Sequence, residues 1–129
     1  GWKVRATPLD SLGLANCHVI KIDVEGFEAQ VLRGAAETIA KFRPLLYVEN
    51  DRPALQGELI ALIAGMGYRQ YWHLPPLFSA NNFNGAAEDV FGQIVSLNML
   101  CIPQERETVV QGIEPIDPAN WTSPIDAKG

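Results

Sequence analysis

The sequence has little of several residue types that mark particular classes of protein. Its 129 residues include two cysteines, Cys17 and Cys101, and two histidines. No cysteine or histidine spacing resembles a zinc site. Both cysteines lie beside apolar segments, so the simplest interpretation is a pair of reduced, buried thiols in a cytosolic protein.

Long apolar runs and an excess of basic residues are also missing. No stretch approaches the length of a membrane span. The first residues lack the basic and apolar regions of a signal peptide, so nothing indicates export. The formal net charge of −5 argues against a nucleic-acid backbone as the main partner. These absences leave one small cytoplasmic domain, long enough for a hydrophobic core.

The most informative stretch that is present covers residues 19–28. It starts as an apolar run that only Lys21 interrupts, and it ends in carboxylates around one glycine: Asp23, Glu25, Gly26 and Glu28. A strand that is apolar on both faces is typical of the middle of an α/β sheet. Ligands bind such sheets at the carboxyl ends of the strands. We therefore expect these carboxylates at a ligand site.

The pattern of apolar and polar residues predicts a mixed α/β chain. It indicates strands over residues 2–6, 18–24, 45–49, 68–73 and 94–102. It indicates a short turn or helix over 9–14 that Thr7 or Asp10 caps, and a helix over 27–42 that Gly34 weakens or bends. A further helix has Asp51 as its cap, Pro53 in its first turn and Gly67 at its end.

The order of these elements predicts how the strands run. Strand, helix and strand over residues 18–49 form a crossover unit, so the two strands are parallel. The carboxylates after the first strand then meet Glu49 and Asp51 at one edge. A long loop without a crossover helix precedes the last strand, which we therefore expect to be antiparallel. Such a loop is often functional or disordered.

Several separated motifs resemble the FkbM-type methyltransferases. Lys21-Ile22-Asp23-Val24-Glu25-Gly26-Phe27-Glu28, residues 31–35 and residues 43–49 resemble the signature of that family. Residues 7–12 are similar to its threonine-leucine-aspartate lead-in, with Pro8 inserted. Residues 98–103 look like its final strand. The resemblance spans about residues 4–103.

The resemblance implies a partial Rossmann-like class I methyltransferase sheet: two parallel strands with crossover helices, a further strand, and an antiparallel last strand. It implies S-adenosylmethionine as cofactor, and O-methylation of a sugar or natural-product hydroxyl. The family's glycine-rich cofactor turn has no counterpart before Asp23. We therefore expect residues 1–103 to be the C-terminal half of the domain and residues 104–129 to be an extended Pro-rich tail. We expect the isolated chain to bind the cofactor weakly or not at all and to be inactive.

Four carboxylates are the candidate catalytic residues: Asp23, Glu25, Glu28 and Glu49. Asp23 would face the reactive methyl or the acceptor hydroxyl, and with Gly26 it would contact the cofactor, although it could simply cap the following turn. Glu28 could equally serve the helix dipole. The same carboxylates, with Asp51, could hold Mg²⁺ through oxygen ligands, although we do not favour a metal site.

Three residues are candidates for binding the acceptor: His73, Asn81 and Asn82. A capped histidine at a strand end and a plain flexible loop are the alternatives. Lys21 would be costly in an apolar strand without a carboxylate partner.

Two competing functions stay open. The chain could be a non-catalytic, oligomerising interaction module derived from a methyltransferase, or a cation-dependent carbohydrate-binding domain. Whatever the function, we expect a homo-oligomer through the apolar edge of the 18–24 strand, unless residues 2–6 cover that edge.

Overall fold

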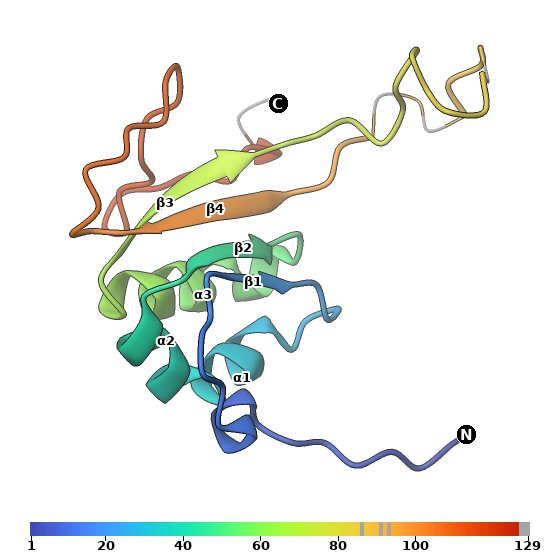
Figure 1. The fold of residues 1–129 in the computed structure, drawn as a ribbon. Coiled ribbons are helices and arrows are strands. Elements are labelled where there is room, and N and C mark those ends of the chain that lie inside the picture. Colours follow the sequence, from blue (N-terminus) through green and yellow to red (C-terminus); the bar gives the residue numbers. More distant parts are fainter. Residues whose placement is uncertain (86, 91, 93, 127–129) are drawn as a thin grey trace.

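The computed structural model describes residues 1–85, 87–90, 92 and 94–126. Within these residues four strands form one sheet in the order β1-β2-β4-β3 (Figure 1). The strands are β1 (Val19–Ile22), β2 (Leu45–Glu49), β3 (Tyr68–His73) and β4 (Asn98–Pro103). β1 and β2 are parallel, and β4 lies antiparallel between β2 and β3. The predicted fold class, two parallel strands followed by an antiparallel last strand, is confirmed.

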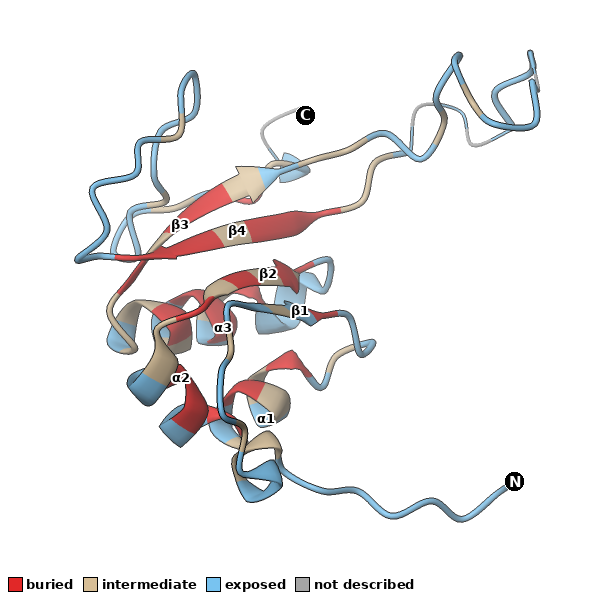
Figure 2. Ribbon diagram, in the orientation of Figure 1, coloured by how far each residue is buried: buried red, intermediate tan, exposed pale blue. Residues whose placement is uncertain are grey.

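The helices lie together beside one face of this sheet (Figure 1). They are the 3₁₀ helix η1 (Leu9–Leu12) and the α-helices α1 (Glu28–Arg33), α2 (Ala36–Phe42) and α3 (Pro53–Gly65). Alternate strand residues point toward them and are fully buried, including Leu46, Val48, Met99 and Cys101 (Figure 2). None of the helices in the described ranges is long and apolar enough to cross a membrane.

Both cysteines are free thiols. Cys101 is buried in the core, where burial raises the pKa of its thiol. Cys17 is only half-buried. The prediction of reduced, buried thiols is therefore confirmed for Cys101 and is too strong for Cys17.

The predicted helix over residues 27–42 is two helices, with a break at Gly34 and Ala35. A side chain at Gly34 would lie 3.2 Å from Cβ of Pro8, and the Asp10 amide donates to the Gly34 carbonyl at 3.0 Å. The segment before β1 therefore packs into the break. Asp10 was expected to cap its own turn. Instead its carboxylate accepts hydrogen bonds from the amides of Glu37 and Thr38, at 3.0 and 2.8 Å, and caps α2.

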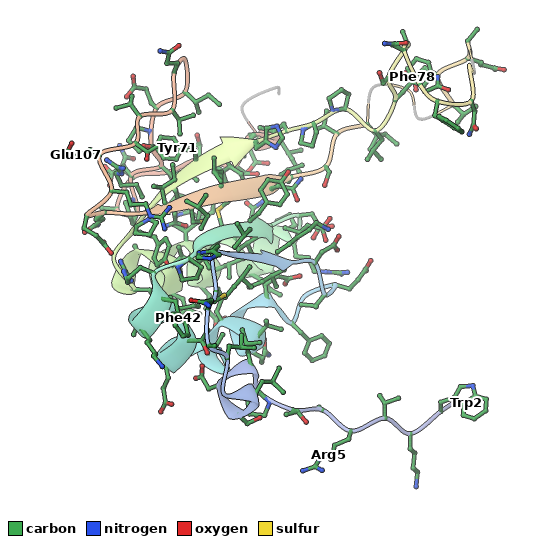
Figure 3. The ribbon with its side chains drawn as sticks, viewed as in Figure 1. Trp2, Arg5, Phe42, Tyr71, Phe78 and Glu107 are labelled. Atoms are coloured by element: carbon green, nitrogen blue, oxygen red, sulfur yellow. The ribbon has the colours of Figure 1, made fainter. Side chains whose placement is uncertain are left out.

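The predicted strand over residues 2–6 is wrong. These residues form an extended arm that points away from the helices, as the positions of Trp2 and Arg5 show (Figure 3). The Trp2 side chain is 98% exposed. The arm does not cover β1, which is an edge strand of the described sheet, with Val19 60% exposed. The expectation of a strand buried on both faces therefore fails.

α3 begins differently from the prediction. Its N-cap is Arg52, without a side-chain cap, so Asp51 does not cap it. Its buried face includes Gln56 and Ile60, whereas Leu55 is 38% exposed. Gln56 can be buried because its amide donates to the Asn50 carbonyl at 2.9 Å.

The remaining strands and the tail follow the prediction in part. β4 starts at Asn98 rather than at residue 94, because the preceding residues belong to the long loop. The tail over residues 104–126 lies along β3, where the Ile116 amide donates to the Gln70 carbonyl at 2.7 Å. Ile116 and Trp121 pack against the core, whereas Ile113 is 41% exposed.

Candidate functional site

Two carboxyl groups meet at the carboxyl ends of β1 and β2. Asp23 follows β1, Glu49 ends β2, and each side chain shifts the pKa of the other. Because the two strands are parallel with Ile22 opposite Val48, the residues that follow come to the same edge. The structure thus brings Asp23 and Glu49 together, as the parallel arrangement predicts.

The pKa values of the two carboxyl groups are shifted in opposite directions. Hydrogen bonds from Lys21 and Glu49 lower the pKa of Asp23. Burial, the hydrogen bond to Asp23 and repulsion by Asp51 raise the pKa of Glu49 to about 7. One proton is therefore shared between an ionised Asp23 and a Glu49 that releases it near neutral pH. The expected carboxylate partner of Lys21 is Asp23, 3.2 Å away, and Lys21 is exposed at the sheet edge rather than buried.

Glu25 and Glu28 take other partners. The Glu28 side chain is buried and accepts hydrogen bonds from the amides of Val24 and Gly26, at 3.3 and 3.1 Å. It therefore holds the turn between β1 and α1 closed. The Glu25 side chain is 83% exposed and forms an ion pair with Arg52 at 2.9 Å.

Gly26 is required by its backbone and its neighbour. Its φ is +99°, a region that favours glycine. A Cβ at this position would lie 3.2 Å from the side chain of Arg52. The positive φ and the close approach of Arg52 together explain why this position is a glycine.

His73 pairs with a residue that the sequence did not single out. Its Nδ1 lies 2.8 Å from the hydroxyl of Tyr47, and the two rings meet edge to face with centroids 5.9 Å apart. The register also places Glu49 opposite Asn98, and Asn98 opposite His73. Sequence reasoning missed Tyr47 and Asn98. The available signals were the alternation of β2, which puts Tyr47 and Glu49 on one face, and the position of Asn98 at the start of the last strand.

Asn81 and Asn82 are not brought to this edge. They belong to the long loop that leaves β3 and extends away from the sheet; Phe78 marks its course in Figure 3. Asn81 is exposed, and the Asn82 side chain donates to the Ser79 carbonyl at 2.9 Å. In this conformation neither asparagine covers the carboxyl pair.

The edge that carries Asp23 and Glu49 matches the charge of the implied cofactor but lacks the space for its adenosine. A sulfonium cation is attracted to the negative edge that Asp23 and Glu49 form. A small cavity lies between the turns that follow β1 and β2, and Gly26, Asn50 and Leu59 help to line it. Its volume is about 40 Å³, far too little for an adenosine. No three histidine, cysteine, aspartate or glutamate side chains of the described ranges are grouped as a metal ion requires.

The family comparison agrees with the motifs. Residues 2–70 match the model of the methyltransferase FkbM domain. Comparison with curated proteins finds no match, and comparison with solved structures finds none either. The matched residues make up more than half of the chain. The chain therefore belongs to the FkbM methyltransferase domain family.

Proposed function

We propose that the protein is part of an S-adenosylmethionine-dependent O-methyltransferase. In it, Asp23 and Glu49 receive the proton of the acceptor hydroxyl. The observation that carries this proposal is the position of Asp23 and Glu49, which directly follow the paired residues Ile22 and Val48 at the carboxyl ends of two parallel strands. A general base works best when its pKa lies near the working pH. The pKa of Glu49, about 7, meets that condition.

The residues of this chain would bind, orient and deprotonate the acceptor. When bound, the cofactor supplies an electrophilic methyl group, with Asp23 and Gly26 on its side of the edge. Asp23, which Lys21 keeps ionised, accepts a hydrogen bond from the acceptor hydroxyl. The hydroxyl proton would pass to the carboxyl pair of Asp23 and Glu49. A sugar or natural-product hydroxyl is the acceptor class that we favour.

We also propose that residues 1–103 form the C-terminal half of the domain and that residues 104–129 form its tail. The sheet order with its antiparallel β4 supports this division, as does the lack of a glycine-rich turn before Asp23. The 129-residue chain should accordingly bind S-adenosylmethionine weakly or not at all. Calorimetry checks this expectation, and micromolar affinity would contradict it. The free thiols of Cys17 and Cys101 support a cytoplasmic location.

Methyl transfer by the full-length protein tests the proposal. Labelled methyl groups should pass from the cofactor to hydroxyl acceptors such as sugars. Glu49→Gln should slow the transfer about 100-fold, a typical loss for a proton acceptor. Glu37→Gln, an exposed position on α2, is the matched control. Transfer that survives both Asp23→Asn and Glu49→Gln would show that the carboxyl pair is not the base.

A non-catalytic, oligomerising module is the second candidate. The open edge of β1 favours it, together with the adjoining apolar groove of about 630 Å³ that Leu9, Ile20 and Val31 help to line. An uncovered strand edge can pair with another chain. Light scattering on the 129-residue chain tests this candidate, because a monomeric mass at high concentration would remove the homo-oligomer.

A further inference from the structure

The small cavity between the turns that follow β1 and β2 is lined by two polar side chains that are almost fully buried. Glu28, the first residue of α1, is 6% exposed, and Asn50, which follows β2, is 3% exposed. Neither Asp23 nor Glu49 lines the cavity. It is therefore a polar site beside the carboxyl pair and separate from it.

Each of these two side chains has one oxygen without a protein partner. The amides of Val24 and Gly26 both donate to Oε1 of Glu28, and Oε2 accepts no hydrogen bond from the described residues. The side-chain amide of Asn50 donates to Sδ of Met99 at 3.4 Å, and no described residue donates to Oδ1. Because a thioether sulfur only accepts, the nitrogen of this amide faces Met99 and Oδ1 faces away from it.

Both oxygens are open to the cavity. In the described part of the chain, the polar side-chain atoms that are sealed from solvent without a partner are Nε of Arg69, Oε1 of Gln70 and Oγ of Ser123. Oε2 of Glu28 and Oδ1 of Asn50 are not sealed in this way, although their side chains are buried. The cavity that both residues line is where these oxygens meet solvent. Two acceptors on one small cavity require an occupant that donates hydrogen bonds or carries positive charge.

The charges around the cavity favour a cation over a neutral molecule. Its charged lining residues are Glu28, Asp51, Arg52 and Glu58. Arg52 pairs with Glu25 at 2.9 Å and Glu58 pairs with Arg33 at 2.6 Å, so these charges are balanced. Glu28 and Asp51 form no ion pair with the described residues. The N-termini of α1 and α3 offset them by roughly half a charge each, which leaves about one net negative charge.

We propose that this cavity binds one alkali-metal cation, with Oε2 of Glu28 and Oδ1 of Asn50 as ligands and water as the remaining ligand. Oxygen is the ligand that hard cations prefer. The volume of about 40 Å³ admits the ion and a water molecule, since a water needs roughly 10–15 Å³. A divalent metal fits less well, because the described residues offer no group of three acidic, histidine or cysteine side chains.

The bound cation would join the turn that follows β1 to the turn that follows β2. These turns directly follow Asp23 and Glu49. The site does not depend on the proposed function, because its ligands, charge and size are argued without the methyl donor or the acceptor.

Anomalous scattering from crystals soaked in a thallium(I) salt tests the site directly, because thallium(I) replaces potassium and scatters strongly. A peak should lie within bonding distance of Oε2 of Glu28 and Oδ1 of Asn50. Glu28→Gln keeps an oxygen for the two backbone amides and removes the charge, so the peak should disappear in that variant. Glu37→Gln, at an exposed position on α2, should keep it. A parent protein without the peak would overturn the proposal.

Thermal unfolding tests the same site in solution. Raising potassium chloride from about 1 to about 100 mM at constant ionic strength should raise the unfolding temperature by roughly 5 °C, the effect of a dissociation constant of about 10 mM. Tetramethylammonium chloride, whose cation is too large for the cavity, keeps the ionic strength constant. Glu28→Gln and the exposed Asp51→Asn should each reduce the response, and Glu37→Gln should not. An unfolding temperature that is the same in both salts would mean that the cavity holds only water, and would overturn the proposal.

Discussion

Glu49 titrates far from its ordinary range, and this has a measurable consequence for stability. The pKa of its carboxyl group is about 7 in the folded protein, against an ordinary value of 4.5. Between these values the folded protein holds a proton that the unfolded chain has released. Stability therefore falls as pH rises through this window, and the full cost of ionising Glu49 is present above pH 7. The lowered pKa of Asp23 acts only at lower pH, because its ordinary value is 3.8.

Glu49→Gln should remove this pH dependence. A glutamine amide can still donate to the Asp23 carboxylate, and it never ionises. The variant should equal the parent in free energy of unfolding near pH 5 and exceed it at pH 8. Urea unfolding at both values measures the difference, with Glu37→Gln as the control. A parent protein whose stability is the same at pH 5 and pH 8 would contradict the shared proton.

Glu28 provides a second test at the residue scale, because two backbone amides bond to its buried carboxylate. Glu28→Ala should lower the free energy of unfolding by about 2 kcal/mol, since those amides lose their acceptor. Glu28→Gln keeps one acceptor oxygen and should lose much less, as chemical denaturation would show. If Glu28 were catalytic, Glu28→Gln would instead slow methyl transfer and leave the free energy of unfolding nearly unchanged.

Among the elements, the junction between α1 and α2 depends on contacts with residues that are distant in the sequence. Asp10 lies 27 and 28 residues before the amides that it accepts from. Asp10→Ala should therefore loosen the start of α2. Hydrogen exchange at the amides of Glu37 and Thr38 should become roughly fivefold faster, as expected for a lost helix cap. Exchange within β4 serves as the control. Unchanged exchange at both amides would show that the cap contributes nothing.

The same distinction between local and distant causes explains which elements were predictable. β2 and β3 match their predicted bounds, because each is a short apolar or aromatic run between turn residues. The strand over residues 2–6 was wrong because alternation alone supplies no partner strand. Gly34 was predicted to weaken or bend the helix over residues 27–42. The contact of Pro8 at the break could not be predicted, because Pro8 is distant in the sequence. Gln56 joined the buried face of α3 because Asn50 offers its amide a carbonyl.

For the molecule as a whole, topology decided how much of the candidate site could be predicted. A strand, a helix and a strand in succession imply parallel strands, which was enough to bring Asp23 and Glu49 to one edge. The contact between Tyr47 and His73 depends on β4 lying between β2 and β3. The sequence motifs resembled a family with such a last strand, but the register that aligns Glu49, Asn98 and His73 belongs to the three-dimensional structure.

The tail is a further property of the whole molecule, because its contacts reach the core from the end of the chain. Trp121 packs against the core beside Gly57 of α3, 3.4 Å from the position of a Cβ there. Nearer its start, Glu105 forms an ion pair with Arg43 at 2.6 Å. These contacts indicate that residues 104–126 stabilise the domain rather than hang from it.

Trp121→Ala should therefore lower the free energy of unfolding by about 2 kcal/mol, less than a fully buried tryptophan because the side chain is only half-buried. Val109→Ala, at a position 77% exposed, should change it by less than about 0.5 kcal/mol. Thermal unfolding followed by circular dichroism measures both. If Trp121→Ala unfolds at the temperature of the parent, the packing of Trp121 adds nothing to stability. If the loss appears, the folded unit extends through the tail, and truncation after Pro103 should cost at least as much as the single substitution.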